Sequence, residues 1–143
     1  MQDVAYSLEL RGHATPVSPG VLLTRAHGTH ALFGGELEAV LEGRLSLLGG
    51  DAFELAATIG LGDGSAIRLR TVEPGSLGAP GEAGLREGTA ICEVDRGSGR
   101  LAGATGRIVS SFLLSDTGEL TETQAGVVRV APPSPSPLLV DVA

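Results

Sequence analysis

Four polar residues near the start of the chain are of types that can bind a charged group or move a proton. Ser7, Glu9 and Arg11 occupy alternate positions, and His30 lies further along the chain. If residues 4–11 form a β-strand, these three side chains share one face, because successive side chains of a strand point to opposite sides. A carboxylate, a guanidinium and an imidazole in one cavity can anchor a polar head group or transfer a proton near neutral pH.

The same pattern has a second interpretation. Charged residues on an alternating strand usually face water, so Glu9 could instead pair with Arg11, or with an arginine of another strand, on a solvated face. Both interpretations stay open at the level of the sequence.

The elements that must position these residues are predicted to be β-strands. Residues 53–61 alternate strictly, and Gly62-Asp63-Gly64 then turns the chain into residues 66–72, which predicts a hairpin. The 22 glycines are spread along the whole chain, as in folds with many short strands and tight turns. Further strands are expected at residues 89–94, 106–114 and 120–131, the last two joined across Asp116-Thr117-Gly118.

A glycine-dense segment, residues 97–106, runs directly into an apolar, β-branched segment at 107–114. Glycine adopts positive φ freely and lets backbones approach closely, so this segment predicts a tight corner between two antiparallel strands. The spacing of its glycines is superficially that of a phosphate-binding loop. Val109 and Phe112 lie where such a loop would need the start of a helix, so no phosphate site is expected.

Three segments have less decisive patterns. Residues 35–48 fit both a helix and a strand, because leucines recur at both spacings. Residues 73–85 predict a long loop. Residues 132–137 predict a stiff, extended tail, and residues 138–143 could add an edge strand or stay free. The expected organisation is one β-barrel domain at 1–131 followed by a proline-rich tail at 132–143.

Composition excludes several classes of function. A net charge of −7 and few aromatic residues argue against nucleic-acid binding. No signal peptide and no apolar run of membrane-spanning length is seen, so a soluble, cytoplasmic protein is expected. The single cysteine, Cys92, forms no internal disulfide and is expected to be buried. His13, His27 and His30 match no metal-ligand spacing, so no metal is expected.

Four stretches, in order, carry a family resemblance: residues 5–16, residues 29–37, residues 50–63 and residues 97–106. Together they resemble the allene oxide cyclase family of small antiparallel β-barrels, which belong to a calycin-like group that includes the related dirigent proteins. The resemblance implies an all-β fold with a single small antiparallel barrel of about eight strands. It also favours the strand interpretation of residues 35–48.

The resemblance implies a function as well. In that family the barrel cavity folds an unsaturated fatty-acid epoxide and closes a ring, and bacterial barrels of similar shape close rings in polyketide products, including by [4+2] cycloaddition. We therefore expect a cofactor-free cyclase for a small, apolar, polyunsaturated or polyketide-derived substrate. A few polar groups in the cavity would bias the charge that develops during ring closure. The alternative is a dirigent-like or carrier barrel that binds a hydrophobic molecule without catalysis.

The resemblance also transfers positions, with departures. The family's first-strand glutamate falls on Ser7, a following asparagine on Glu9, a Ser-Pro pair on Thr15-Pro16, a further asparagine on His30 and a tyrosine near Val72. On this basis Glu9 and His30 are the expected catalytic residues. The expected substrate-binding residues are Ser7, Arg11, Thr15, Pro16, Phe33, Phe53, Val72 and Phe112.

An inward Glu9 has a consequence for association. If Ser7 and Glu9 point into the barrel, the opposite face of the strand is left outside, and it carries Val4, Tyr6, Leu8 and Leu10. Soluble monomers avoid large exposed apolar patches. A homo-oligomer, either a dimer or a trimer, is therefore expected. Plant members of the family are trimers.

Overall fold

A computed structural model describes residues 2–81 and 84–130 of the chain. This part forms nine β-strands: β1 (Gln2–Ser18), β2 (Val21–His30), β3 (Leu37–Gly49), β4 (Ala52–Gly60), β5 (Ala66–Thr71), β6 (Gly75–Leu77), β7 (Arg86–Ser98), β8 (Thr105–Leu114) and β9 (Glu119–Val130). In the part that the structure describes, no helix is long and apolar enough to cross a membrane.

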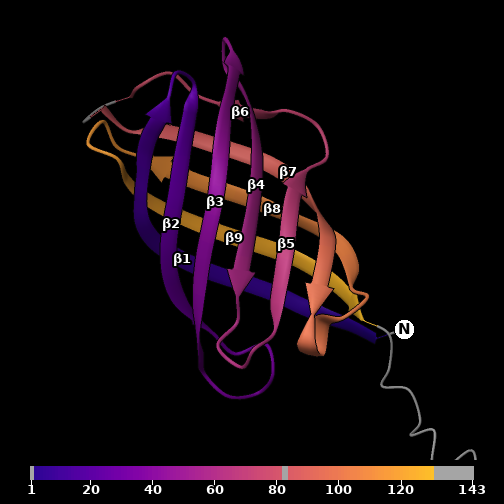
Figure 1. The fold of residues 1–143 in the computed structure, drawn as a ribbon. Helices are drawn as coiled ribbons and strands as arrows, with labels where there is room; N and C mark the ends of the chain where they lie inside the picture. Colours follow the sequence, from indigo (N-terminus) through magenta and orange to yellow (C-terminus); the bar gives the residue numbers. More distant parts are fainter. Residues whose placement is uncertain (1, 82–83, 131–143) are drawn as a thin grey trace, which may run out of the picture.

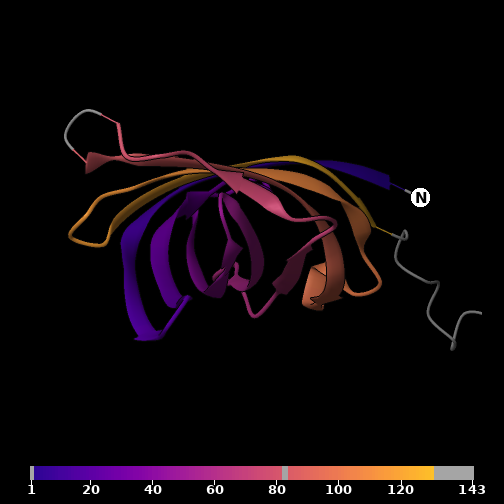
Figure 2. The ribbon, with the colours of Figure 1, turned by 90° about the horizontal axis from the view of Figure 1, so that it is seen from above.

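Eight of the strands close into a barrel. Their order is β3-β2-β1-β9-β8-β7-β5-β4, and the pairing of β4 with β3 closes the ring. Every pairing in the sheet is antiparallel. Figure 1 shows β2 to β5 side by side in one wall with β7, β8 and β9 crossing behind them, and Figure 2 shows the strands curving around one interior. The predicted all-β antiparallel barrel is confirmed.

The less decisive segments now have structures. Residues 37–48 belong to β3, while residues 35 and 36 precede it, so the strand interpretation is confirmed for most of the segment. The predicted loop at 73–85 contains the short strand β6. It pairs with β4 and β7 beyond the end of β5, which lies between the same two strands. The tail at 132–143, and with it the expected stiff segment and edge strand, lies outside the described residues.

The glycine-dense corner is confirmed between β7 and β8. A 3₁₀ turn, Gly99–Leu101, connects the two strands, and Glu93 pairs with Arg107 where their ladder begins. Gly99 and Gly103 have φ of +63° and +74°, values that residues with a side chain adopt at a cost. Leu101 is buried, so this corner also covers part of the barrel interior.

The face of β1 that points into the barrel is the opposite of the one expected. Tyr6, Leu8 and Leu10 are at most 2% exposed, whereas Ser7, Glu9 and Arg11 are exposed on the outside. Burying a large apolar side chain contributes about 1.5–3 kcal/mol, while burying an unpaired charge is costly, so the apolar face goes inward. The prediction that Ser7, Glu9 and Arg11 face the cavity is wrong.

This correction also removes the argument for association. Tyr6, Leu8 and Leu10 pack in the core and Val4 is half-buried, so they form no outer apolar face. The homo-oligomer stays a prediction without that support.

The interior of the barrel is closely packed around two aromatic rings. Phe53 of β4 and Phe112 of β8 meet edge to face with ring centroids 5.4 Å apart. A side chain at Gly75 or at Gly88 would overlap the Phe53 ring or the Phe112 ring, respectively. Glycine at these two positions therefore gives the rings their room.

Candidate functional site

A cluster of polar side chains lies inside the barrel, on the inner faces of three neighbouring strands. Glu122 and Gln124 come from β9, Ser110 from β8 and Tyr6 from β1. Glu122 is 5% exposed and Gln124 is fully buried. They point inward because they share the strand face of Leu120 and Val128, which are core residues. Polar groups at core positions cost stability unless they are hydrogen-bonded.

The cluster forms one connected hydrogen-bond network. The Tyr6 hydroxyl donates to Oε1 of Gln124 over 2.8 Å, and the Gln124 amide donates to Oε2 of Glu122. The Ser110 hydroxyl donates to the same Oε2 over 3.0 Å. One carboxyl oxygen thus receives two hydrogen bonds, and the position of the Glu122 side chain is fixed from two strands.

The burial of this network changes how its groups titrate. Desolvation raises the pKa of Glu122, and the hydrogen bonds from Gln124 and Ser110 offset only part of that rise. Burial, and then the Glu122 charge, also raises the pKa of Tyr6, and the same two causes raise the pKa of Cys92 to about 11. Tyr6 and Cys92 are therefore protonated at neutral pH, and the site favours the protonated form of Glu122.

A protonated carboxyl in an apolar interior has a specific chemical capacity. It donates a hydrogen bond through its O–H, which a carboxylate in water does not. Held in a low-dielectric site, such a donor stabilises negative charge that develops on a nearby oxygen. Buried carboxyl groups with a raised pKa are candidates for functional sites.

His30 is buried as expected, but it does not meet Glu9. Its Nε2 lies 2.7 Å from the Leu61 carbonyl oxygen, and its Nδ1 accepts a hydrogen bond from the Leu32 amide at 3.2 Å. Both ring nitrogens therefore contact backbone groups at the end of the barrel. Its ring also meets Phe33 edge to face at 5.7 Å, which indicates a structural role in closing that end.

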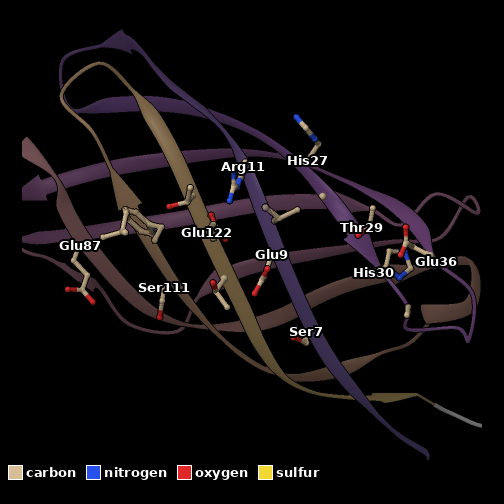
Figure 3. A pocket seen from close by; sticks show the side chains of 17 residues that line it. Ser7, Glu9, Arg11, His27, Thr29, His30, Glu36, Glu87, Ser111 and Glu122 are labelled. Atoms are coloured by element: carbon tan, nitrogen blue, oxygen red, sulfur yellow. The ribbon is translucent and has the colours of Figure 1, made fainter.

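The outward residues Ser7, Glu9 and Arg11 line a hollow on the outer surface, with a volume of about 1150 Å³. Figure 3 shows these three along β1, with His27 and Thr29 on one side and Ser111 on the other. Serine, threonine and carboxylate groups dominate this hollow. The prediction that these residues are neighbours in one site is correct. The site, however, is an open surface and not the barrel interior.

The remaining predicted binding residues are dispersed. Phe53 and Phe112 are in the core, and Phe33 is half-buried with the Arg100 guanidinium 4.8 Å from its ring centroid. Thr15 and Pro16 are exposed near the end of β1, and Val72 is 40% exposed just after β5. Phe112 lines the same hollow as Glu9 and Glu122, and the other five residues do not.

The interior cluster was missed at the level of the sequence. Residues 120–131 were predicted as a strand, and Glu122 and Gln124 alternate in step with Leu120 and Val128. Polar residues at positions that a period of two assigns to the core are the signal that could have identified them.

Within residues 2–81 and 84–130, no three His, Cys, Asp or Glu side chains come together as metal ligands. Comparisons of the chain with known protein families, with curated proteins and with solved structures found no match.

Proposed function

We propose that this chain is a cofactor-free cyclase, which folds a small, apolar, polyunsaturated or polyketide-derived molecule inside the barrel and promotes ring closure. The observation that carries the proposal is Glu122, a carboxyl buried in the barrel interior and held by hydrogen bonds from Gln124 and Ser110. Such a carboxyl costs stability, and a catalytic role accounts for its retention.

The proposed chemistry needs no other reactant. Ring closure of this type rearranges bonds within one molecule, so most of the rate enhancement comes from holding the chain in a reactive conformation. Where charge develops on a carbonyl or epoxide oxygen, Glu122 in its protonated form donates a hydrogen bond to that oxygen, and because no proton is transferred the carboxyl stays neutral when the ring has closed. Gln124 and Ser110 position the carboxyl, and Tyr6 positions Gln124.

Glutamine substitutions at Glu122 and Glu9 test the proposal directly. The purified protein is incubated with a panel of conjugated polyenes, and ring closure is followed as loss of their ultraviolet absorbance. Glu122→Gln should slow turnover by about two to four orders of magnitude. Glu9→Gln is the matched control, since Glu9 lies on the outside of the neighbouring strand, and it should leave turnover unchanged. Equal rates for wild type and Glu122→Gln contradict the assignment.

One observation favours the carrier alternative. Apart from the polar cluster the inner wall is largely aliphatic, with Leu8, Leu41 and Ile59 among its buried residues, and such a wall suits an apolar ligand that undergoes no reaction. The two functions differ in a single readout. A carrier binds the conjugated fatty acid cis-parinaric acid and the polyene panel but returns every compound unchanged, whereas the cyclase converts at least one polyene.

A further inference from the structure

His30 connects two segments at one end of the barrel, the loop at residues 31–36 and the turn at residues 61–65. Both segments lie at the lower end of the barrel in Figure 1. The His30 Nε2 is 2.7 Å from the Leu61 carbonyl oxygen, and its Nδ1 is 3.2 Å from the Leu32 amide nitrogen. A carbonyl oxygen can only accept and a backbone N–H can only donate, so Nε2 carries the proton and Nδ1 carries none. The two contacts therefore require one neutral tautomer of the ring.

The closed arrangement leaves no room for a second proton on this ring. That proton would bind to Nδ1 and point at the Leu32 N–H, so that two donors would face each other. His30 is also only 4% exposed, and an unpaired charge at a buried position is costly. The imidazole can therefore become charged only when the ring and the loop separate.

The loop at residues 31–36 has few restraints besides His30. Leu32 and Phe33 pack against the core, and the Phe33 ring also contacts the Arg100 guanidinium, 4.8 Å from the ring centroid. A Cβ at Gly34 or Gly35 would meet no atom within 4 Å, so the tip of the loop is loosely packed. The hydrogen bond from Leu32 to the His30 ring thus holds a segment that can otherwise move.

The neighbouring turn and the corner at residues 99–104 are joined without His30. The Arg100 amide donates to the Ser65 hydroxyl over 2.9 Å, and the Arg100 guanidinium lies 3.4 Å from the Asp63 carboxylate. The Ser65 amide donates to Asp63 over 2.8 Å, and this hydrogen bond lowers the pKa of that carboxyl. The Asp63–Arg100 pair therefore persists in mild acid, and acid should release the loop before it separates the turn from the corner.

The charged groups around His30 do not stabilise an imidazolium. They are Glu9 on β1, Glu36 in the loop, Glu38 on β3, Asp63 in the turn, Arg100 in the corner and Glu122 on β9. The first three are exposed to solvent, and Asp63 is paired with Arg100. Among the described residues, none of these carboxylates forms an ion pair with the ring.

We propose that His30 is a pH-sensitive switch that opens this end of the barrel in acid by releasing residues 31–36. Imidazole in water becomes charged below about pH 6.5. The open form binds one proton more than the closed form, so each unit of pH below that value favours opening by up to about tenfold. The switch requires no ligand and no turnover, so it stands or falls independently of the proposed function.

Amide hydrogen exchange, measured by NMR at pH 7.5 and pH 5.0, tests the switch. Each rate is divided by that of an unstructured peptide at the same pH, which gives a protection factor for each amide. The protection factors of Leu32 and Gly34 should fall about tenfold or more at pH 5.0, because the loop opens locally. The protection factors of Arg100 and Ala104 should stay the same, because the corner keeps its contacts with the turn and its own hydrogen bonds.

His30→Asn separates the titration of the imidazole from the other effects of acid. The asparagine side-chain oxygen can accept the Leu32 N–H, as in an Asx turn, and it gains no proton in this pH range. Leu32 in this variant should have equal protection at both pH values. His27→Asn is the matched control, since His27 is exposed on the same strand, and it should respond to acid as wild type does.

Three results would overturn the inference. The first is unchanged protection of Leu32 in wild type between the two pH values. The second is an equal loss at Leu32 and Ala104 in wild type, because acid would then unfold the whole domain. The third is a loss at Leu32 in His30→Asn that equals the loss in wild type. The comparison of Leu32 with Ala104 in wild type decides the question even when His30→Asn does not fold.

Discussion

Glu9 and Glu122 are near neighbours on two paired strands, and they differ in almost every physical respect. Glu9 pairs in the ladder with Thr123, the residue that follows Glu122. Glu9 is exposed to solvent on the outside of the barrel, whereas Glu122 is buried and receives hydrogen bonds from Gln124 and Ser110. The chemistry of a carboxyl in a closed barrel is thus decided by which face of the sheet it occupies.

A shift of one residue in the β1–β9 register would exchange the two faces of β1. The register is held because Tyr6, Leu8 and Leu10 fill the core only in the observed arrangement. The same packing that stabilises the barrel therefore excludes Glu9 from its interior.

The largest expected difference between the two faces is in packing. Phe112 fills the core and Leu113, its neighbour on β8, is 42% exposed. Phe112→Ala should lower the free energy of unfolding by about 3–5 kcal/mol, because it leaves a cavity. Leu113→Ala should change it by about 0.5 kcal/mol or less, as is usual for surface substitutions. Urea unfolding of both variants measures the contrast, and similar losses would contradict the assignment of inner and outer faces.

A smaller loss in the free energy of unfolding is expected when the hydrogen-bond network is disrupted on β9. Gln124→Leu removes the partner of both the Tyr6 hydroxyl and the Glu122 carboxyl, and a buried polar group left unpaired costs about 1–3 kcal/mol. Thr123→Ala, at the adjacent outward position, should stay within about 0.5 kcal/mol of wild type. If Gln124→Leu is as stable as wild type, the hydrogen bonds of Gln124 do not hold the network together.

The pH dependence of the free energy of unfolding tests the burial of Glu122. The pKa of Glu122 is raised above its ordinary value of 4.5, so the folded state binds more protons than the unfolded state as the pH rises above that value. The contribution of Glu122 to stability is therefore complete below about pH 4.5 and is lost as the pH rises through the folded-state pKa. Each pKa unit corresponds to about 1.4 kcal/mol. Urea unfolding across the pH range should show this loss in wild type, and Glu122→Gln should flatten it. An identical pH slope in the variant would contradict the account.

The smallest effect concerns Cys92, which titrates in the same interior. Its pKa of about 11 keeps the thiolate scarce at pH 8, and burial limits access. Alkylation by iodoacetamide should be slower in the native protein than in urea by about a hundredfold or more. Mass spectrometry of timed samples gives both rates, and fast native labelling would show that the interior opens readily.

Much of the fold could be predicted from the sequence, because its determinants are local. Alternation over residues 53–61 and the turn at 62–64 specify a hairpin, and the glycines of residues 97–106 specify a corner. The burial of Cys92 followed from its apolar neighbours, and the structure confirms it. The strand at 35–48 was open on pattern alone and depended on the resemblance.

The site could be predicted less well, since it depends on which face closes around the core. The alternation at residues 4–11 defines two faces but does not orient them, and the resemblance favoured the polar one. On β9 the outward Thr121 and Thr123 alternate with the inward Glu122 and Gln124, so a contrast between apolar and polar residues is absent there. Only the pairing of β9 with β1 and β8 brings Glu122, Tyr6 and Ser110 together.

The central claim is that Glu122 is a buried carboxyl that the barrel keeps protonated to a higher pH than usual. Carbon-13 NMR of the glutamate side-chain carboxyl carbons measures this directly, with Glu122→Gln identifying the resonance. The account predicts that the signal lost in Glu122→Gln titrates with a pKa above the ordinary value of 4.5. A pKa for that carboxyl at or below 4.5 would contradict it, because burial would then not favour the protonated form of Glu122.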